Sequence, residues 1–183
     1  MKELTATFHS EVFRPVVTLI VPGFYGTSTI ALSLLQHFPL LKQQMDAYPG
    51  LAAAVFLLSV LTAGLIAEEF GARIEMSFDR ALSKNVKYES HFEEWFAYLR
   101  LAFDKEPVGH RYLRSLVLRL KFELGMIVST VPFWLGTLTL CVPCFWRCLM
   151  MVLSAILAAY LLFEARCSNE TLSELRREML RKE

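Results

Sequence analysis

The most reactive side chains of this sequence lie in one short segment, Cys-Val-Pro-Cys-Phe-Trp-Arg-Cys, which contains Cys141, Cys144 and Cys148. A Cys-x-x-Cys pair can bind a metal ion or interconvert between thiol and disulfide forms. A structural zinc site needs four ligands, however, and His37 is the only histidine on the same side of the membrane in the topology predicted below. We therefore expect packing residues, with no metal and no cofactor. A Cys141–Cys144 or Cys144–Cys148 disulfide stays an open alternative.

The other candidates for chemistry do not form a catalytic pattern. The four histidines are scattered along the chain: His9, His37, His91 and His110. The sequence contains no Gly-Lys-Ser/Thr loop, no Gly-x-Ser-x-Gly turn and no His-Glu-x-x-His helix. Glu68 and Glu69 could accept protons, but their place at the end of an apolar stretch favours a charged stop to a membrane span. We predict a non-enzymatic protein with no catalytic residues.

Long uncharged stretches indicate a membrane protein. The chain has 183 residues, of which 55% are hydrophobic, and its 19 basic and 18 acidic residues are segregated between apolar runs. A membrane-spanning helix needs about 20 apolar residues. Four stretches approach that length: Pro15–Leu35, Leu51–Ala67, Leu124–Trp146 and Leu149–Phe163. The fold predicted is all-α, with four transmembrane helices. In the alternative, the last two stretches form a re-entrant hairpin.

Basic residues give the orientation. With four spans, 17 of the 19 Lys and Arg residues lie in segments 1–14, 71–123 and 164–183, on one side of the membrane. Only Lys42 and Arg147 lie on the other side, and Arg147 would have to extend to the interface. Because basic segments stay cytoplasmic, we expect both termini and the central segment to lie inside a bacterial inner membrane.

The chain therefore divides into four parts. Residues 1–70 hold the N-terminal segment and the first two spans, 71–123 form a cytoplasmic helical segment, 124–163 hold the last two spans, and 164–183 form a charged tail helix. Ile74, Phe78 and Leu82 continue the second span as an amphipathic helix. A second apolar stripe leads into the third span: Leu113, Leu116, Val117 and Leu120. Thr171 and Glu174 fit a capping box at the start of the tail helix.

An aromatic stripe marks the middle of the cytoplasmic segment. Phe92, Trp95, Phe96 and Phe103 recur at helical spacing on one face. About fifty residues cannot build a large core alone, so these rings need another surface. We expect them to form a homo-oligomer interface; an intramolecular helical cap is the alternative.

A basic cluster precedes the third span. Arg111, Arg114, Arg119 and Lys121 lie where they can contact anionic lipid headgroups, at about 1 kcal/mol per residue near the surface. Nucleic-acid binding would require a broader basic field, and acidic residues dilute this one, so none is expected.

The spans themselves carry hydroxyl groups but no buried charge. Their polar residues are Thr18, Thr27, Ser28, Thr29, Ser33, Ser59, Thr62, Ser129, Thr130, Thr137 and Thr139. Such hydroxyls bond backbone carbonyls or neighbouring helices, or line a pore in an oligomer. Proton relays and ion pathways normally need buried charges, so a transporter is disfavoured. Pro22 and Gly23 should kink the first span, either as a packing feature or as a gating hinge.

A family resemblance adds a functional context. Phe13-Arg14-Pro15-Val16-Val17-Thr18 leads into Pro22-Gly23, and the second span ends in Glu68-Glu69-Phe70-Gly71-Ala72-Arg73-Ile74-Glu75. With the size and span layout, this signature over residues 13–75 resembles small membrane accessory proteins of bacterial anti-phage loci. These are encoded beside type VI-B CRISPR effectors and beside RADAR adenosine-deaminase systems. The resemblance implies an accessory role at the inner membrane.

Two functions are therefore expected. The first is an oligomeric pore or membrane-perturbing effector of an anti-phage system. The second is a non-conducting membrane scaffold that docks a soluble defence effector through residues 71–123.

Overall fold

The structure is a computed structural model that describes residues 2–82 and 108–181, with side chains described for residues 16–81 and 112–175. Five helices account for almost all of these residues: α1 (Lys2–His37), α2 (Pro39–Ala47), α3 (Pro49–Leu82), α5 (Val108–Thr139) and α6 (Cys144–Arg181). The described residues contain no strand. The prediction of an all-α protein is confirmed.

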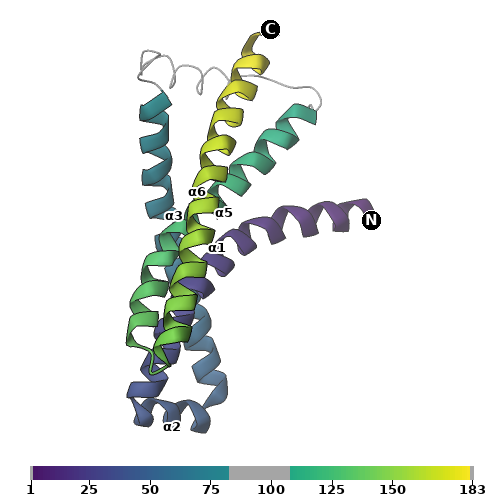
Figure 1. The fold of residues 1–183 in the computed structure, drawn as a ribbon. Helices are drawn as coiled ribbons and strands as arrows, with labels where there is room; N and C mark the ends of the chain where they lie inside the picture. The colour runs from purple at the N-terminus through teal and green to yellow at the C-terminus, as the bar shows by residue number, and fades with distance from the viewer. Residues whose placement is uncertain (1, 83–107, 182–183) are drawn as a thin grey trace.

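Four long helices form a bundle, and the short α2 lies across one end of it (Figure 1). The chain runs along α1 to α2, returns along α3, runs back along α5 and returns again along α6. α5 packs against α1, α3 and α6 and so occupies the middle of the bundle. Both chain ends lie away from α2, and the N-terminal part of α1 turns aside from the bundle (Figure 1).

Three helices within the described part of the chain are long and apolar enough to cross a membrane: Val16–His37 of α1, Pro49–Ala81 of α3 and Cys144–Leu175 of α6. The predicted count of four spans is thereby corrected to three, and α5 is not among them. The predicted third span, Leu124–Trp146, is interrupted because α5 ends at Thr139 and α6 begins at Cys144. The uncharged part of α5, residues 124–139, is 16 residues long, below the roughly 17–25 that a span needs. α5 nevertheless runs back along the bundle, packed against all three candidate spans, so both chain ends still lie away from α2 (Figure 1).

α6 is longer than the sequence pattern indicates. It continues without a break from Cys144 to Arg181, about 57 Å at the ordinary rise per residue. A re-entrant segment is much shorter than this, so that alternative does not describe α6. The capping-box prediction is wrong, because no helix begins near Thr171; its hydroxyl donates to the Cys167 carbonyl one turn earlier.

Glycines set the closest approach between helices. A Cβ at Gly23 of α1 would lie 2.0 Å from the Val60 carbonyl oxygen, and one at Gly64 of α3 would lie 2.2 Å from the Leu19 carbonyl oxygen. Only a residue without a side chain lets two backbones meet this closely. α1 and α3 therefore cross in contact at Gly23 and Gly64.

Candidate functional site

A set of ion pairs, the charged collar, links three helices of the bundle. It consists of Glu68 (α3), Arg119, Lys121 and Glu123 (α5), and Glu164 (α6). Arg119 Nε donates to Glu123 Oε1 at 2.7 Å, and its Nη2 donates to Glu164. Lys121 Nζ donates to Glu68 Oε1 at 2.7 Å. The hydrogen bond and negative charge of Glu123, aided by Glu164, raise the pKa of Arg119.

Glu123 is the most enclosed member of the collar, with a side chain only 5% exposed. A buried carboxylate is costly unless it is paired and hydrogen-bonded. Besides Arg119, it accepts a hydrogen bond from Ser168 Oγ of α6 at 3.3 Å. α5 and α6 are thus joined at this level by Arg119, Glu123, Glu164 and Ser168.

The collar lies one membrane thickness from the α2 end. Nineteen residue steps separate Pro49 from Glu68 on α3, and twenty separate Cys144 from Glu164 on α6, which correspond to about 29 and 30 Å of helix. The hydrocarbon core of a bilayer is about 30 Å thick. The distance from the collar to α2 and the turn at 140–143 therefore equals the thickness of a hydrocarbon core.

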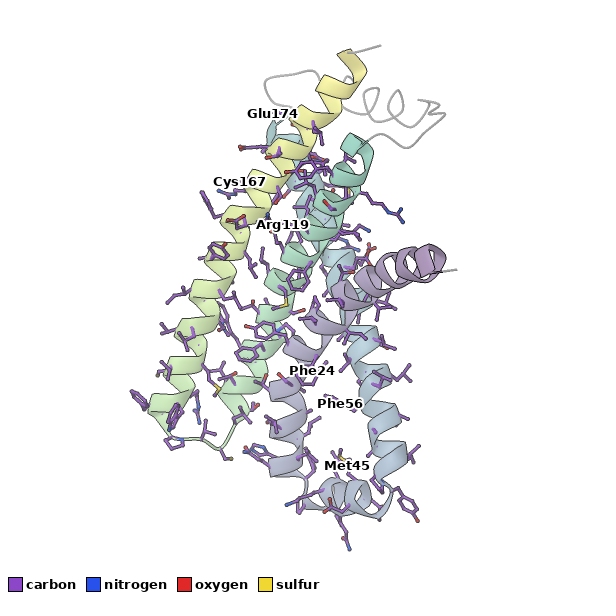
Figure 2. The ribbon with its side chains drawn as sticks, turned by 90° about the vertical axis from the view of Figure 1, so that its right-hand side faces the viewer. Phe24, Met45, Phe56, Arg119, Cys167 and Glu174 are labelled. Atoms are coloured by element: carbon purple, nitrogen blue, oxygen red, sulfur yellow. The ribbon has the colours of Figure 1, made fainter. Side chains whose placement is uncertain are left out.

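Beyond the collar, α3, α5 and α6 continue together as a helical extension, residues 71–82, 108–118 and 165–181. Beyond the level of Arg119 of α5, Cys167 and then Glu174 follow along α6 (Figure 2). The extension is packed, because Leu113, Leu116 and Leu172 are buried within it. At its base lies the core cluster of Leu120, Leu124 and Ala165, which Ile74 and Phe78 of α3 cover.

Polar contacts also hold the extension together. Asn169 is 3% exposed and donates from Nδ2 to Asp79 Oδ1 at 3.3 Å. The Arg166 guanidinium lies 5.7 Å from the Phe78 ring centroid, a distance typical of cation–π contacts. These contacts join α6 to α3, so the extension is a three-helix unit.

Cysteines and a basic residue gather at the opposite end, around the turn at 140–143. Cys141, Cys144 and Cys148 are exposed free thiols, and the Sγ atoms of Cys144 and Cys148 lie 3.9 Å apart. The Arg147 guanidinium donates to the carbonyls of Leu140 and Val142 at 2.8 and 3.4 Å. It thus satisfies acceptors beyond the C-terminus of α5, where a positive charge is favourable. The described residues contain no group of three or more metal ligands.

The hydroxyl groups of the spans bond within the bundle. Thr29 Oγ1 donates to the Phe133 carbonyl at 2.9 Å, and Ser33 Oγ donates to Thr139 Oγ1 at 2.8 Å, both between α1 and α5. Trp134 Nε1 donates to Ser154 Oγ of α6 at 2.6 Å. These groups connect helices and satisfy one another inside the bundle.

The predicted site residues fall into three groups. Phe92, Trp95, Phe96 and Phe103 lie outside the described residues. In the basic cluster, Arg119 and Lys121 bind carboxylates of the collar, Arg114 is exposed, and the side chain of Arg111 is not described. The predicted kink residues, Pro22 and Gly23, are buried inside α1, which is helical through both of them.

Sequence reasoning missed most of the polar contacts between helices in the collar and the extension. The pairing of Arg119 with Glu123 has a sequence signal, since opposite charges four residues apart meet on one helix face. The contacts of Ser168 with Glu123 and of Asn169 with Asp79 have none, because they depend on how α6 aligns with α5 and α3.

Comparison of the chain with protein-family models, curated proteins and solved structures found no match.

Proposed function

We propose that this protein is a non-enzymatic membrane anchor whose helical extension docks a soluble partner on the cytoplasmic side. One observation supports the proposal: α3, α5 and α6 continue together past the collar and form a packed, charged unit there. A bundle that served only to cross a bilayer would not need α6 to continue for 17 residues past Glu164.

The distribution of basic residues supports the orientation. The α2 end carries only Lys42 and Arg147 as basic residues, and Arg147 binds backbone carbonyls there. The described segments at the end with the collar and both termini, residues 2–14, 71–82, 108–123 and 164–181, carry twelve. By the positive-inside rule, this end faces the cytoplasm of a bacterium and α2 faces outward. The anti-phage context rests on the resemblance of residues 13–75 alone.

An oligomeric pore is the competing function. Three features of the sequence favour it: the hydroxyl content of the spans, the aromatic stripe and the family resemblance. Several of the hydroxyls, Thr29 and Ser33 among them, bond within the bundle. A pore would therefore have to form between copies of the chain. Pore formation can therefore be tested separately from the docking of a soluble partner.

The test is binding of cytosolic proteins to the full-length protein in nanodiscs. Met76 and Tyr112 are large apolar side chains of the extension with 48% and 53% exposure, so they are candidates for partner contact. We expect a stoichiometric soluble partner that is lost in the Met76→Ala/Tyr112→Ala variant and retained in Leu153→Ala, a change in the apolar layer.

Dye release from liposomes distinguishes the pore. The anchor function predicts no release with or without the captured partner. Release by the parent protein, together with no stoichiometric partner, would replace the anchor with the pore.

A further inference from the structure

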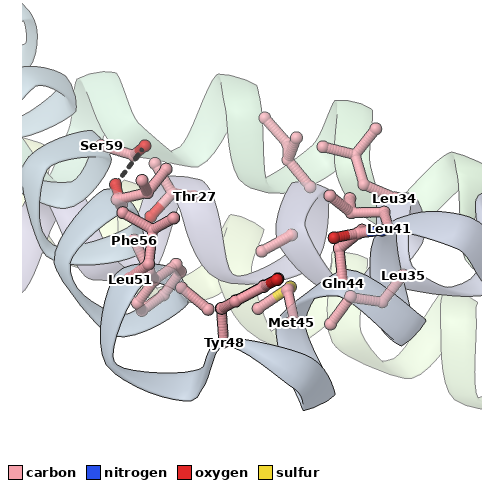
Figure 3. Close-up of a pocket in the computed structure, with 14 residues that line it drawn as sticks. Thr27, Leu34, Leu35, Leu41, Gln44, Met45, Tyr48, Leu51, Phe56 and Ser59 are labelled. Atoms are coloured by element: carbon pink, nitrogen blue, oxygen red, sulfur yellow. Dashed lines mark hydrogen bonds between the residues drawn. The ribbon is translucent and has the colours of Figure 1, made fainter.

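A large apolar hollow lies between α1, α2 and α3, near the α2 end of the bundle (Figure 3). Its volume is about 400 Å³. The side chains around it come from all three helices and include Ala31, Leu34, Met45, Ala52 and Phe56. Both long helices that border it are candidate membrane spans, so the hollow opens within the apolar layer.

The residues that line the hollow are not suited to bind a charged ligand. No lining residue carries a charge. The hydroxyls of Thr27 and Ser59 donate to carbonyls of their own helices, Gly23 at 2.7 Å and Val55 at 2.9 Å. Among the lining residues, only Gln44 of α2 and Tyr48, directly after α2, bring further polar groups. The occupant must therefore be apolar over most of its length.

The hollow is closed at both ends along the bundle. On the collar side, α1 and α3 meet at Gly23 and Gly64, and Phe24 contacts Phe56 edge to face with ring centroids 5.9 Å apart. At the other end, α2 joins the two helices, with Met45 below the aromatic pair (Figure 2). A membrane-spanning helix, about 10 Å wide, cannot pass through a space that is closed above and below.

The length of the hollow matches one leaflet. Its lining on α3 runs from Leu51 to Ser59, about 12 Å of helix. Half of a ~30 Å hydrocarbon core is about 15 Å. The occupant is thus apolar, flexible enough to enter sideways, and short enough to lie within a single leaflet.

We propose that the hollow binds one acyl chain of a phospholipid from the leaflet next to α2. Lipid tails are as apolar as leucine, so transfer from the bilayer gains little from the hydrophobic effect. Retention comes from filling a space whose walls otherwise lack dispersion partners. Unlike the scaffold function, this binding requires no protein partner.

Photo-crosslinking tests the site. Full-length protein is reconstituted with a phospholipid that carries a diazirine on its acyl chain, extracted into mild detergent so that only retained lipid remains, and irradiated. We expect adducts on residues that line the hollow. Ala52→Trp fills the space and should abolish them, whereas Ala53→Trp, on an exposed neighbour outside the hollow, should keep them.

Two further measurements keep the result interpretable. Ala31→Phe fills the hollow from α1, and circular dichroism checks that each variant remains helical. Native mass spectrometry should show a phospholipid retained by the parent and by Ala53→Trp only. A parent without retained lipid, or lipid retained equally by all variants, overturns the proposal. So does a dimer by light scattering that Ala52→Trp dissociates, because the occupant is then a second copy.

Discussion

Arg119 is the residue on which the collar depends most, because among the five collar residues it is the one that binds two carboxylates, Glu123 of α5 and Glu164 of α6. Its partner Glu123 is enclosed, so loss of the guanidinium leaves a buried negative charge with only the Ser168 hydroxyl. Such a carboxylate keeps its desolvation cost without its compensation. Loss of a solvent-exposed ion pair leaves no buried charge behind, so its cost in stability is much smaller.

We therefore predict that Arg119→Ala lowers the free energy of unfolding by about 1.5–3 kcal/mol, the range for hydrogen bonds to charged groups. Arg73→Ala is the matched control: Arg73 pairs with Glu69 at 3.5 Å, and both side chains are more than 60% exposed. Its loss should cost at most about 1 kcal/mol. Unfolding in mixed micelles with increasing denaturing detergent measures both. Equal losses would show that burial of Glu123 contributes nothing.

A second prediction for a single residue concerns Gly64, at the crossing of α1 and α3. Its missing side chain would meet the Leu19 backbone at 2.2 Å, so Gly64→Ala must push α1 and α3 apart. We expect a loss of about 1–3 kcal/mol, as for other overpacked sites. Gly50→Ala is the control, because a Cβ there meets nothing within 4 Å. The same unfolding assay compares them, and a Gly64→Ala variant as stable as Gly50→Ala would contradict the close crossing.

At the scale of elements, the sequence predicted the helices better than their ends. The absence of charge between Leu124 and Trp146 suggested one span, yet the chain turns at 140–143. Pro143, directly before α6, was a readable stop signal that the uncharged run concealed. α2 was missed for a similar reason. Pro39 and Pro49 begin α2 and α3, the position where proline favours a helix start, but the nine residues of α2 lack a long apolar period.

The hydrophobic period of each helix could not predict how one helix aligns against another. The amphipathic stripe of Ile74 and Phe78 correctly indicated a packed face, and that face covers the core cluster of Leu120, Leu124 and Ala165. Its partners on α6 depend on the rise and rotation of a helix almost a hundred residues later. The apolar hollow is also invisible in sequence, since it exists only because α2 holds α1 and α3 apart below their crossing.

The placement of α2 and of the extension on opposite sides of the membrane is a prediction at this scale. In a cysteine-free background, a single cysteine at position 43 of α2 should react with an impermeant maleimide from outside spheroplasts. One at position 170 of α6 should react only after lysis. Both native residues are exposed, so a difference between them reports topology and not burial. Labelling of position 170 from outside would overturn the proposed orientation.

At the scale of the whole molecule, the extension and the membrane-embedded bundle share their helices. α5 and α6 run through both parts without a break, and the core cluster lies at the junction. Separate folding of the two parts would require helices to unwind at the collar, where the ion pairs and the Glu123–Ser168 contact hold them. We therefore expect the extension and the membrane-embedded bundle to unfold together as one cooperative unit, and the extension not to be an independent domain.

A substitution at the junction tests this unity. Leu120 is fully buried there, and Leu120→Ala should cost about 2–5 kcal/mol, as core truncations do. Reporter cysteines replace two buried residues, Leu172 in the extension and Thr137 near the α2 end, and thiol-labelling rates measure how often each opens. In a single unit Leu120→Ala accelerates labelling at both positions, whereas Leu153→Ala, at a position 57% exposed in the apolar layer, accelerates neither. If only position 172 responds, the extension opens on its own, and a docked partner could be released without disturbing the membrane-embedded helices.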